Sequence, residues 1–302
     1  MSTDNGWLER VRALPPAKRA LLEELILRRA AASPGSADPV VDVELLRPGS
    51  RADPVVLAHP IGGSLFCYVS LCQALRSGPA VWGVAAGTAL AEPAEFTMGE
   101  LASRYVAALT SAGVVRPAVI AGWSFGGLLA YEMARQYQTA GTPPVLLIDA
   151  VPWPESAPPW DQEATLRTFT GYLLGLAGEN PDLPIDPALW QLPVPDALAG
   201  AAQAVLEYGA HLGLSGTELT ARYWVYANGA RAISGYRPGR STGPVTLLRT
   251  AGTDSEGAPW PAETGSSLRI ARVPGDHYSV LRPPIVDSVA ELLAQIAGFW
   301  TF

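Results

Sequence analysis

The strongest chemical signal in the sequence is the run Gly122-Trp123-Ser124-Phe125-Gly126, which has the pattern G-x-S-x-G. A β-rich run over residues 118–121 precedes the serine and a helical run follows it, which is the context of a sharp turn from strand to helix. Glycines suit such a turn because larger side chains would collide there with neighbouring backbone. The pattern predicts that Ser124 presents its hydroxyl as a nucleophile.

A serine hydroxyl is a poor nucleophile until an adjacent imidazole takes its proton. The chain has three histidines, at positions 59, 211 and 277. His59 ends the first core strand, and His211 lies within a helical insertion. His277 lies between the last predicted strand and the final helix, so we predict it as the general base and then the general acid.

A third residue must orient that imidazole, and two aspartates compete for the position. Asp149 follows a strand predicted over 145–148, and Asp254 follows one predicted over 245–249. Both give the chain order Ser, Asp, His. Asp276 is adjacent to the base, and because adjacent side chains diverge we expect it to hold the loop. The residues alone leave both Asp149 and Asp254 open.

Acyl transfer also needs two backbone N–H donors for the tetrahedral oxyanion. Phe125, the residue after the nucleophile, is expected to supply one. The loop after the first core strand, residues 59–64, contains paired glycines that let backbone approach a substrate closely. We predict Ile61 as the second donor, with Gly62 as the next choice.

The elements that position these residues alternate along the chain. Strands are predicted over 55–58, 80–84, 118–121, 145–148, 245–249 and 268–273, and helices over 98–112, 128–138 and 286–297. Such alternation predicts an α/β fold with a mostly parallel central sheet and helices on both faces. A helical insertion at about 152–218 interrupts the pattern, and we expect it to form a lid over the site.

The first 38 residues differ from the rest. Residues 17–29 place leucines and an isoleucine at helical spacing, and a linker rich in alanine, serine and proline follows. We therefore expect an N-terminal helix and linker over 1–38 and the α/β domain over 39–302. The helix either packs on its own domain or joins two copies in a homodimer.

Composition narrows the range of partners. The 302 residues include 21 basic and 28 acidic side chains, a formal net charge of -7, which argues against a nucleic-acid partner. Two cysteines, Cys67 and Cys72, make no disulfide framework and have no metal-ligand spacing with the histidines. We expect no metal site, and no membrane segment because no apolar run reaches the roughly 20 residues of a span. We expect a cytoplasmic protein.

Several motifs together resemble the terminal (type I) thioesterase domains of modular polyketide and nonribosomal peptide synthases. The resemblance covers about residues 43–302. It is carried by the segments LLRPG at 45–49, HPIGG at 59–63, GWSFGG at 122–127, AYEMA at 130–134, LID at 147–149 and GDH at 275–277.

This resemblance implies an α/β-hydrolase fold and selects between the two aspartates. In that family the acid follows the strand after the nucleophile helix, which matches Asp149. In stand-alone editing (type II) thioesterases it lies one strand later, as Asp254 would. The placement of the acid therefore bears on function.

The implied reaction transfers an acyl or peptidyl chain from the phosphopantetheine of a carrier protein onto Ser124. Water, or a hydroxyl or amine within the chain, then releases the product, and an internal nucleophile closes a ring. No cofactor is implied beyond the phosphopantetheine that presents the acyl thioester. An editing thioesterase and a general carboxylesterase are the alternatives.

Carrier proteins are usually acidic, so an overall charge of -7 would repel one. Docking then needs a local basic patch. The N-terminal helix offers one at Lys18, Arg19, Arg28 and Arg29.

Overall fold

The computed structural model describes residues 38–49, 53–75, 78–137, 141–152, 160–177, 186–207, 215–251, 260 and 268–299. The predicted N-terminal helix, its four basic residues and the homodimer expected through it lie outside the described residues. His211 and Asp254 also lie outside them.

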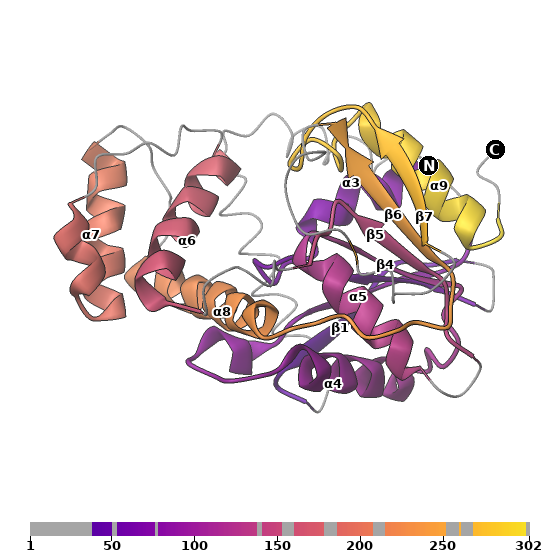
Figure 1. Ribbon diagram of the computed structural model, residues 1–302, viewed down its shortest axis with the longest axis horizontal. Coiled ribbons are helices and arrows are strands. Elements are labelled where there is room, and N and C mark those ends of the chain that lie inside the picture. Colours follow the sequence, from indigo (N-terminus) through magenta and orange to yellow (C-terminus); the bar gives the residue numbers. More distant parts are fainter. Residues whose placement is uncertain are drawn as a thin grey trace, which may run out of the picture.

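A seven-stranded sheet forms the centre of the fold (Figure 1). Its strands are β1 (Val41–Arg47), β2 (Val55–Ala58), β3 (Val81–Ala86), β4 (Val119–Trp123), β5 (Val145–Ile148), β6 (Val245–Thr250) and β7 (Leu268–Val273). Their order is β1-β3-β2-β4-β5-β6-β7, with β1 antiparallel to β3 and all other pairs parallel. The predicted α/β class and mostly parallel sheet are confirmed.

The parallel strands end almost level with one another. Ala58 pairs with Gly122, and Ile148 pairs with both Trp123 and Leu248. The residues that follow these strand ends must therefore gather at one edge of the sheet, where α/β folds place their sites.

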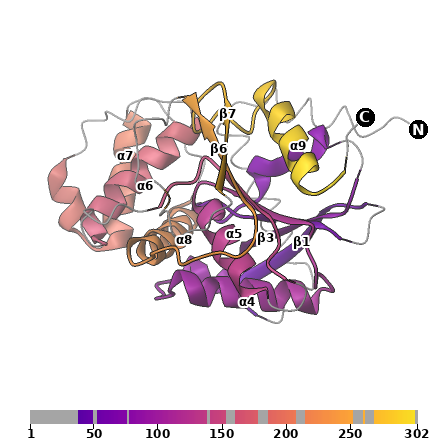
Figure 2. The ribbon, with the colours of Figure 1, turned by 45° about the vertical axis from the view of Figure 1, so that its right-hand side comes forward.

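Helices cover both faces of the sheet (Figure 2). One face packs against α4 (Met98–Ser111) and α5 (Phe125–Gln136), and the other against α3 (Val69–Ala74) and α9 (Ile285–Ile296). Successive strand residues alternate between the two layers, as the pleat requires. For example, Val56 lies in the α4–α5 core and its neighbour Leu57 in the α3–α9 core.

Three further helices lie between β5 and β6, and in Figure 1 they extend beyond one end of the sheet. They are α6 (Gln162–Ala177), α7 (Val194–Glu207) and α8 (Gly216–Ser234), with the short helix η3 (Pro187–Gln191) between the first two. Their buried residues form a separate apolar cluster that includes Leu166, Phe169, Trp190, Leu198 and Tyr223.

Among the strands and α-helices of the described residues, three were not anticipated from the sequence: the edge strand β1, the short helix α3 and the long helix α8. Because α8 continues to Ser234, helical structure between β5 and β6 runs beyond residue 218. Two short helices, η1 (Phe66–Tyr68) and η2 (Thr88–Ala91), lie in loops that follow β2 and β3.

Candidate active site

Ser124 occupies the sharp turn between β4 and α5, with φ of 57° and ψ of -125°. A positive φ is uncommon for a residue with a side chain and stores local strain. Glycine is needed on both sides. A methyl group on Gly122 would collide with the carbonyl oxygen of Gly126, and one on Gly126 would collide with that of Ala58.

His277 and Asp149 meet at the same edge of the sheet. The imidazole Nδ1 lies 2.7 Å from Oδ2 of Asp149, whose side chain is fully buried, while that of His277 is 32% exposed. The other carboxylate oxygen, Oδ1, accepts hydrogen bonds from the backbone N–H and the hydroxyl of Thr250, at 3.1 and 3.3 Å. A carboxylate on Nδ1 keeps the proton there, which leaves Nε2 to act as a base.

Trp123 holds the His277 loop beside the serine turn. Its indole N–H donates to the backbone carbonyl of His277 at 3.0 Å, and the two rings lie 5.0 Å apart between centroids. Because Trp123 immediately precedes Ser124, these contacts fix the imidazole close to the candidate nucleophile.

Tyr68 connects the ends of two central strands. Its buried hydroxyl donates to the carbonyl of Ala58 at 2.7 Å and accepts from the backbone N–H of Trp123 at 2.8 Å. The bond fixes the end of β2 against the end of β4, and with it the loops that carry His59 and Ser124.

His59 shapes the loop after β2 and is held neutral. Its Nδ1 lies 2.7 Å from the carbonyl oxygen of Pro60, so this nitrogen donates, and Nε2 accepts from the hydroxyl of Tyr105 at 2.6 Å. Burial lowers the pKa of His59 to about 4, and the bond to Pro60 opposes this shift. A neutral, buried imidazole of this kind is a structural part of the loop.

The two residues predicted as oxyanion donors meet at one point on α8. A methyl group on Gly229 would lie 3.2 Å from Cγ1 of Ile61 and 3.6 Å from Cε2 of Phe125. The loop is also covered by α6, since the Tyr172 hydroxyl occupies the space that a side chain on Gly62 would need. The structure thus brings Ile61 and Phe125 together beside the serine turn.

Asp276 holds the turn that carries His277, as expected. Its Oδ1 accepts from the backbone N–H groups of Tyr278 and Ser279, both at 2.9 Å. Sequence reasoning missed Thr250 and Tyr68. The sequence offers one weak indication of Thr250, which ends the strand β6 that neighbours β5. It offers none of Tyr68.

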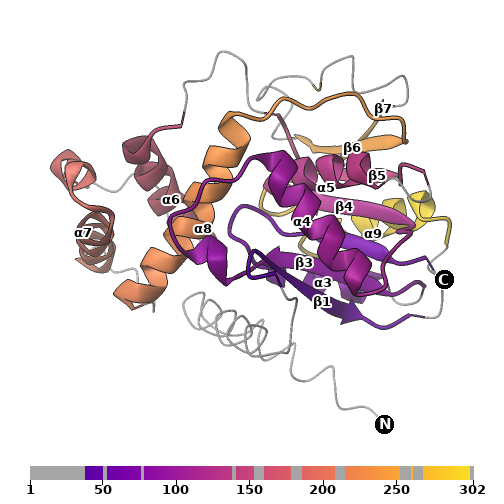
Figure 3. The ribbon, with the colours of Figure 1, turned by 90° about the horizontal axis from the view of Figure 1, so that it is seen from below.

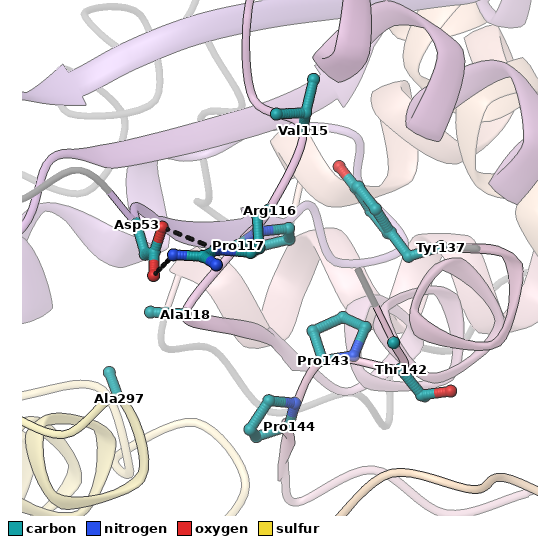
Figure 4. Close-up of a pocket in the computed structure, with 11 residues that line it drawn as sticks. Asp53, Val115, Arg116, Pro117, Ala118, Tyr137, Thr142, Pro143, Pro144 and Ala297 are labelled. Atoms are coloured by element: carbon teal, nitrogen blue, oxygen red, sulfur yellow. Dashed lines mark hydrogen bonds and ion pairs between the residues drawn. The ribbon is translucent and has the colours of Figure 1, made fainter. Parts of the chain in front are cut away.

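A hollow of about 390 Å³ lies at the opposite edge of the sheet, among the segments that lead into β2, β4 and β5 (Figure 4). An ion pair of 2.8 Å between Asp53 and Arg116 lines it. Nothing in the described ranges gathers three metal-ligating side chains, and no helix described there is long and apolar enough to cross a membrane.

Comparison with known proteins identifies the family. Residues 53–296 match the family model described as the thioesterase domain. The chain is 29% identical over 230 residues to a dimodular nonribosomal peptide synthase of Bacillus subtilis (strain 168), covering 72% of this chain and 9% of that protein. It is 28% identical over 258 residues to a non-reducing polyketide synthase of Cladonia metacorallifera, covering 81% and 12%. The chain thus spans about a tenth of the length of these curated relatives.

The fold is also that of solved thioesterase domains. The structure of the Vlm2 thioesterase domain superimposes with a TM-score of 0.56 at 22% identity, covering 85% of this chain and 98% of that one. This likeness shows the α/β-hydrolase fold, in agreement with the parallel sheet and its strand order. With the family model matched over most of its length, the chain belongs to the thioesterase domain family of hydrolases, related to the terminal domains of polyketide and nonribosomal peptide synthases.

Proposed function

We propose that this domain releases an acyl or peptidyl chain from the phosphopantetheine thiol of a carrier protein through an acyl-enzyme on Ser124. The observation that carries the proposal is the 2.7 Å contact between His277 Nδ1 and Asp149 Oδ2, beside the turn that holds Ser124. Such a pair gives a serine hydroxyl the base that it lacks by itself.

In the first half of the reaction, Nε2 of His277 takes the proton of the Ser124 hydroxyl as Oγ attacks the thioester carbonyl carbon. The backbone N–H groups of Ile61 and Phe125 stabilise the resulting oxyanion. The C–S bond then breaks, and the imidazolium gives its proton to the departing thiolate. The products are the acyl-Ser124 ester and the free phosphopantetheine thiol.

In the second half, Nε2 takes a proton from water, or from a hydroxyl or amine within the bound chain, as that group attacks the ester carbonyl. The new tetrahedral intermediate collapses, and the imidazolium returns the proton to Ser124 Oγ. Water gives a free acid, whereas an internal hydroxyl or amine gives a lactone or lactam. Exclusion of water by a closed apolar cover favours ring formation.

The helices between β5 and β6 are the proposed lid, placed from the sequence at about residues 152–218. Their cluster is apolar. The ring of Tyr172 stacks on that of Phe169 and lies tilted against that of Tyr226, while its hydroxyl lies against Gly62. Contact with the loop after β2 supports a role in covering the site. An aromatic cover suits an apolar acyl chain.

Asp149 as the acid supports release at the end of a synthase over editing of stalled carriers, because the editing enzymes place their acid one strand later. The domain is proposed to be cytoplasmic, and because its net charge of -7 would repel an acidic carrier protein, docking requires a local basic patch. We retain the N-terminal helix as the proposed site of that patch and of a homodimer contact.

Activity on matched substrates tests the proposal. Purified protein is given an acyl thioester of pantetheine and the oxygen ester of the same acyl group, and Ser124→Ala is assayed beside it. Turnover of the thioester that is lost in Ser124→Ala supports the proposal. Equal turnover of both esters would favour a general carboxylesterase, and full activity of Ser124→Ala would reject Ser124 as the nucleophile.

A further inference from the structure

We propose that α8 sets the positions of the two oxyanion donors, with Gly229 as the point of contact and Asn228 as the positioning residue that fixes the helix. This inference rests on the proposed function, because it takes Ile61 and Phe125 as the donors. It adds that residues distant in sequence, on a helix that carries no catalytic group, control their geometry.

α8 belongs to two apolar cores at once. Leu219, Tyr223 and Ala227, which all precede residue 228, lie in the cluster shared with α6 and α7. Ala232 and Ile233 near its end lie in the core shared with α4 and α5. Figure 3 shows the helix running from α6 and α7 to the α4 side of the sheet. Val225 already packs against this second core, so the two cores overlap along the turn that leads to residues 228 and 229.

At that point the helix directly contacts the loop after β2, residues 59–64, which carries Ile61. Gly229 is buried, and a single methyl group there would lie 3.2 Å from Ile61 Cγ1, closer than ordinary van der Waals contact. One turn earlier, Val225 packs on the same loop, because a methyl group on Gly63 would lie 2.6 Å from its Cγ1. The absence of a side chain at Gly229 therefore lets α8 support the loop without displacing Ile61.

Asn228 fixes the position of α8 relative to this loop. Asn228 is 1% exposed, and its side chain makes three hydrogen bonds to the backbone of η2 and of the residues that follow it. Nδ2 donates to the carbonyls of Leu90 and Glu92, at 3.1 and 2.8 Å, and Oδ1 accepts from Ala94 N–H at 3.2 Å. A buried amide with this many partners permits little sliding of the helix.

Arg231 adds a second attachment to the same segment. Its guanidinium donates to the carbonyl of Ala94 at 3.0 Å and lies 4.1 Å over the ring of Trp160. The helix is thus held to the body just before Gly229, by Asn228, and just after it, by Arg231, while its first half packs in the aromatic cluster of α6 and α7. We infer that α8 stays fixed and keeps both donors aimed at one point.

The variant Gly229→Ala tests the contact, and Gly235→Ala is its matched control. Gly235 caps the same helix at φ of -90°, and a methyl group there meets nothing within 4 Å. Loss of one oxyanion donor costs about 10²–10³-fold in kcat. A displaced donor in Gly229→Ala should therefore lower kcat for the pantetheine thioester about 10- to 100-fold, with KM within about twofold.

The melting temperature of Gly229→Ala distinguishes a displaced oxyanion donor from general damage to the fold. Alanine is the better helix former, so the melting temperature of Gly229→Ala should not fall below that of the wild type. Ile61 acts through its backbone, so Ile61→Ala should keep the donor and remove the clash. The double variant Gly229→Ala/Ile61→Ala should therefore recover most of the lost kcat, a coupling that general damage would not produce.

The variant Asn228→Asp is a second, independent test. It replaces the amide NH₂ group, which donates to two carbonyls, with a carboxylate oxygen that can only accept. We expect kcat of Asn228→Asp to fall with KM unchanged. If this variant does not fold, the inference is tested by Gly229→Ala alone. A kcat for Gly229→Ala equal to that of Gly235→Ala, or no recovery in the double variant, would overturn the inference while Ser124→Ala stays inactive. Activity retained in Ser124→Ala would instead reject the proposed function.

Discussion

The imidazole of His277 lies 2.7 Å from the buried carboxylate of Asp149, although 127 residues separate them in the chain. The sheet makes this contact, since Asp149 follows β5 and His277 follows β7, two strands away in the same parallel order. The second oxygen of Asp149 is held by Thr250 at the end of β6, the strand between them. The end of β6 therefore orients the Asp149 carboxylate toward the imidazole of His277.

Asp149→Asn should leave a folded protein with kcat reduced by up to ~10⁴-fold, because the amide stabilises the wrong imidazole tautomer. The measurement is steady-state turnover of a pantetheine thioester together with the melting temperature. Thr250→Val removes only the hydroxyl bond, keeps the backbone N–H bond, and should have a much smaller effect. A fully active Asp149→Asn would remove Asp149 from the mechanism and make Asp254 the residue to test.

Trp123→Phe should lower kcat by about 10- to 100-fold, since displacement of a catalytic group by about 1 Å has costs of this size. The change removes the indole N–H that holds the carbonyl of His277 but keeps an aromatic ring in the turn. Trp82→Phe, on β3, is the control for loss of an indole elsewhere in the sheet. Equal kcat in the two variants would show that the indole bond does not position His277.

His59 predicts a pH dependence of stability. Burial holds the pKa of His59 near 4 in the folded protein, against about 6.5 in the unfolded chain, so the unfolded state binds the extra proton first as pH falls. The free energy of unfolding should therefore decrease between pH 6.5 and 4, by about 3 kcal/mol from this residue, and level off below that range.

Urea unfolding at several pH values measures this slope, with His59→Asn as the comparison. The asparagine side chain does not titrate, and its amide reaches toward the carbonyl of Pro60 as Nδ1 does. The slope over pH 4–6.5 should be shallower in the variant. Identical slopes would mean that His59 is not buried in its neutral form.

Strain at Ser124 predicts an unusual order of stability. At φ of 57° glycine is relaxed whereas a residue with a Cβ is not, so Ser124→Gly should be more stable than Ser124→Ala by about 1 kcal/mol. Both variants lack the Ser124 hydroxyl, and they are compared by their free energies of unfolding. At Ser111, an exposed residue at the end of α4, alanine should be the more stable substitution. If alanine were more stable than glycine at Ser124 as well as at Ser111, the result would argue against strain at the turn.

The parallel strands and the residues after them were predictable because each strand is a short apolar run with a clear end. The predicted bounds of β2, β5 and β7 agree with the structure. The edge strand β1 was missed because only one of its residues is fully buried and acidic residues interrupt it. These are Asp42 and Glu44, and because the strand is half-buried, desolvation raises the pKa of both carboxyl groups.

The helix α8 escaped prediction for a different reason. Its two halves bury residues against different cores, Tyr223 toward α6 and α7 and Ile233 toward α4 and α5, so no single apolar stripe runs along it. α3 is a helix of six residues, too short for a periodic pattern. The partners of Asp149 and Trp123 depend on tertiary contacts with Thr250 and Tyr68, which no local spacing encodes.

Mass spectrometry of the protein during turnover tests the central claim most directly. The protein is mixed with a hydroxyacyl thioester of pantetheine, quenched, digested and searched for an acyl group on the peptide that contains Ser124. The account predicts an acyl-Ser124 adduct that forms before product and is absent in Ser124→Ala, with a lactone or a free acid released afterwards. Turnover of the thioester without any adduct on Ser124, or an adduct on another residue that survives in Ser124→Ala, would contradict it.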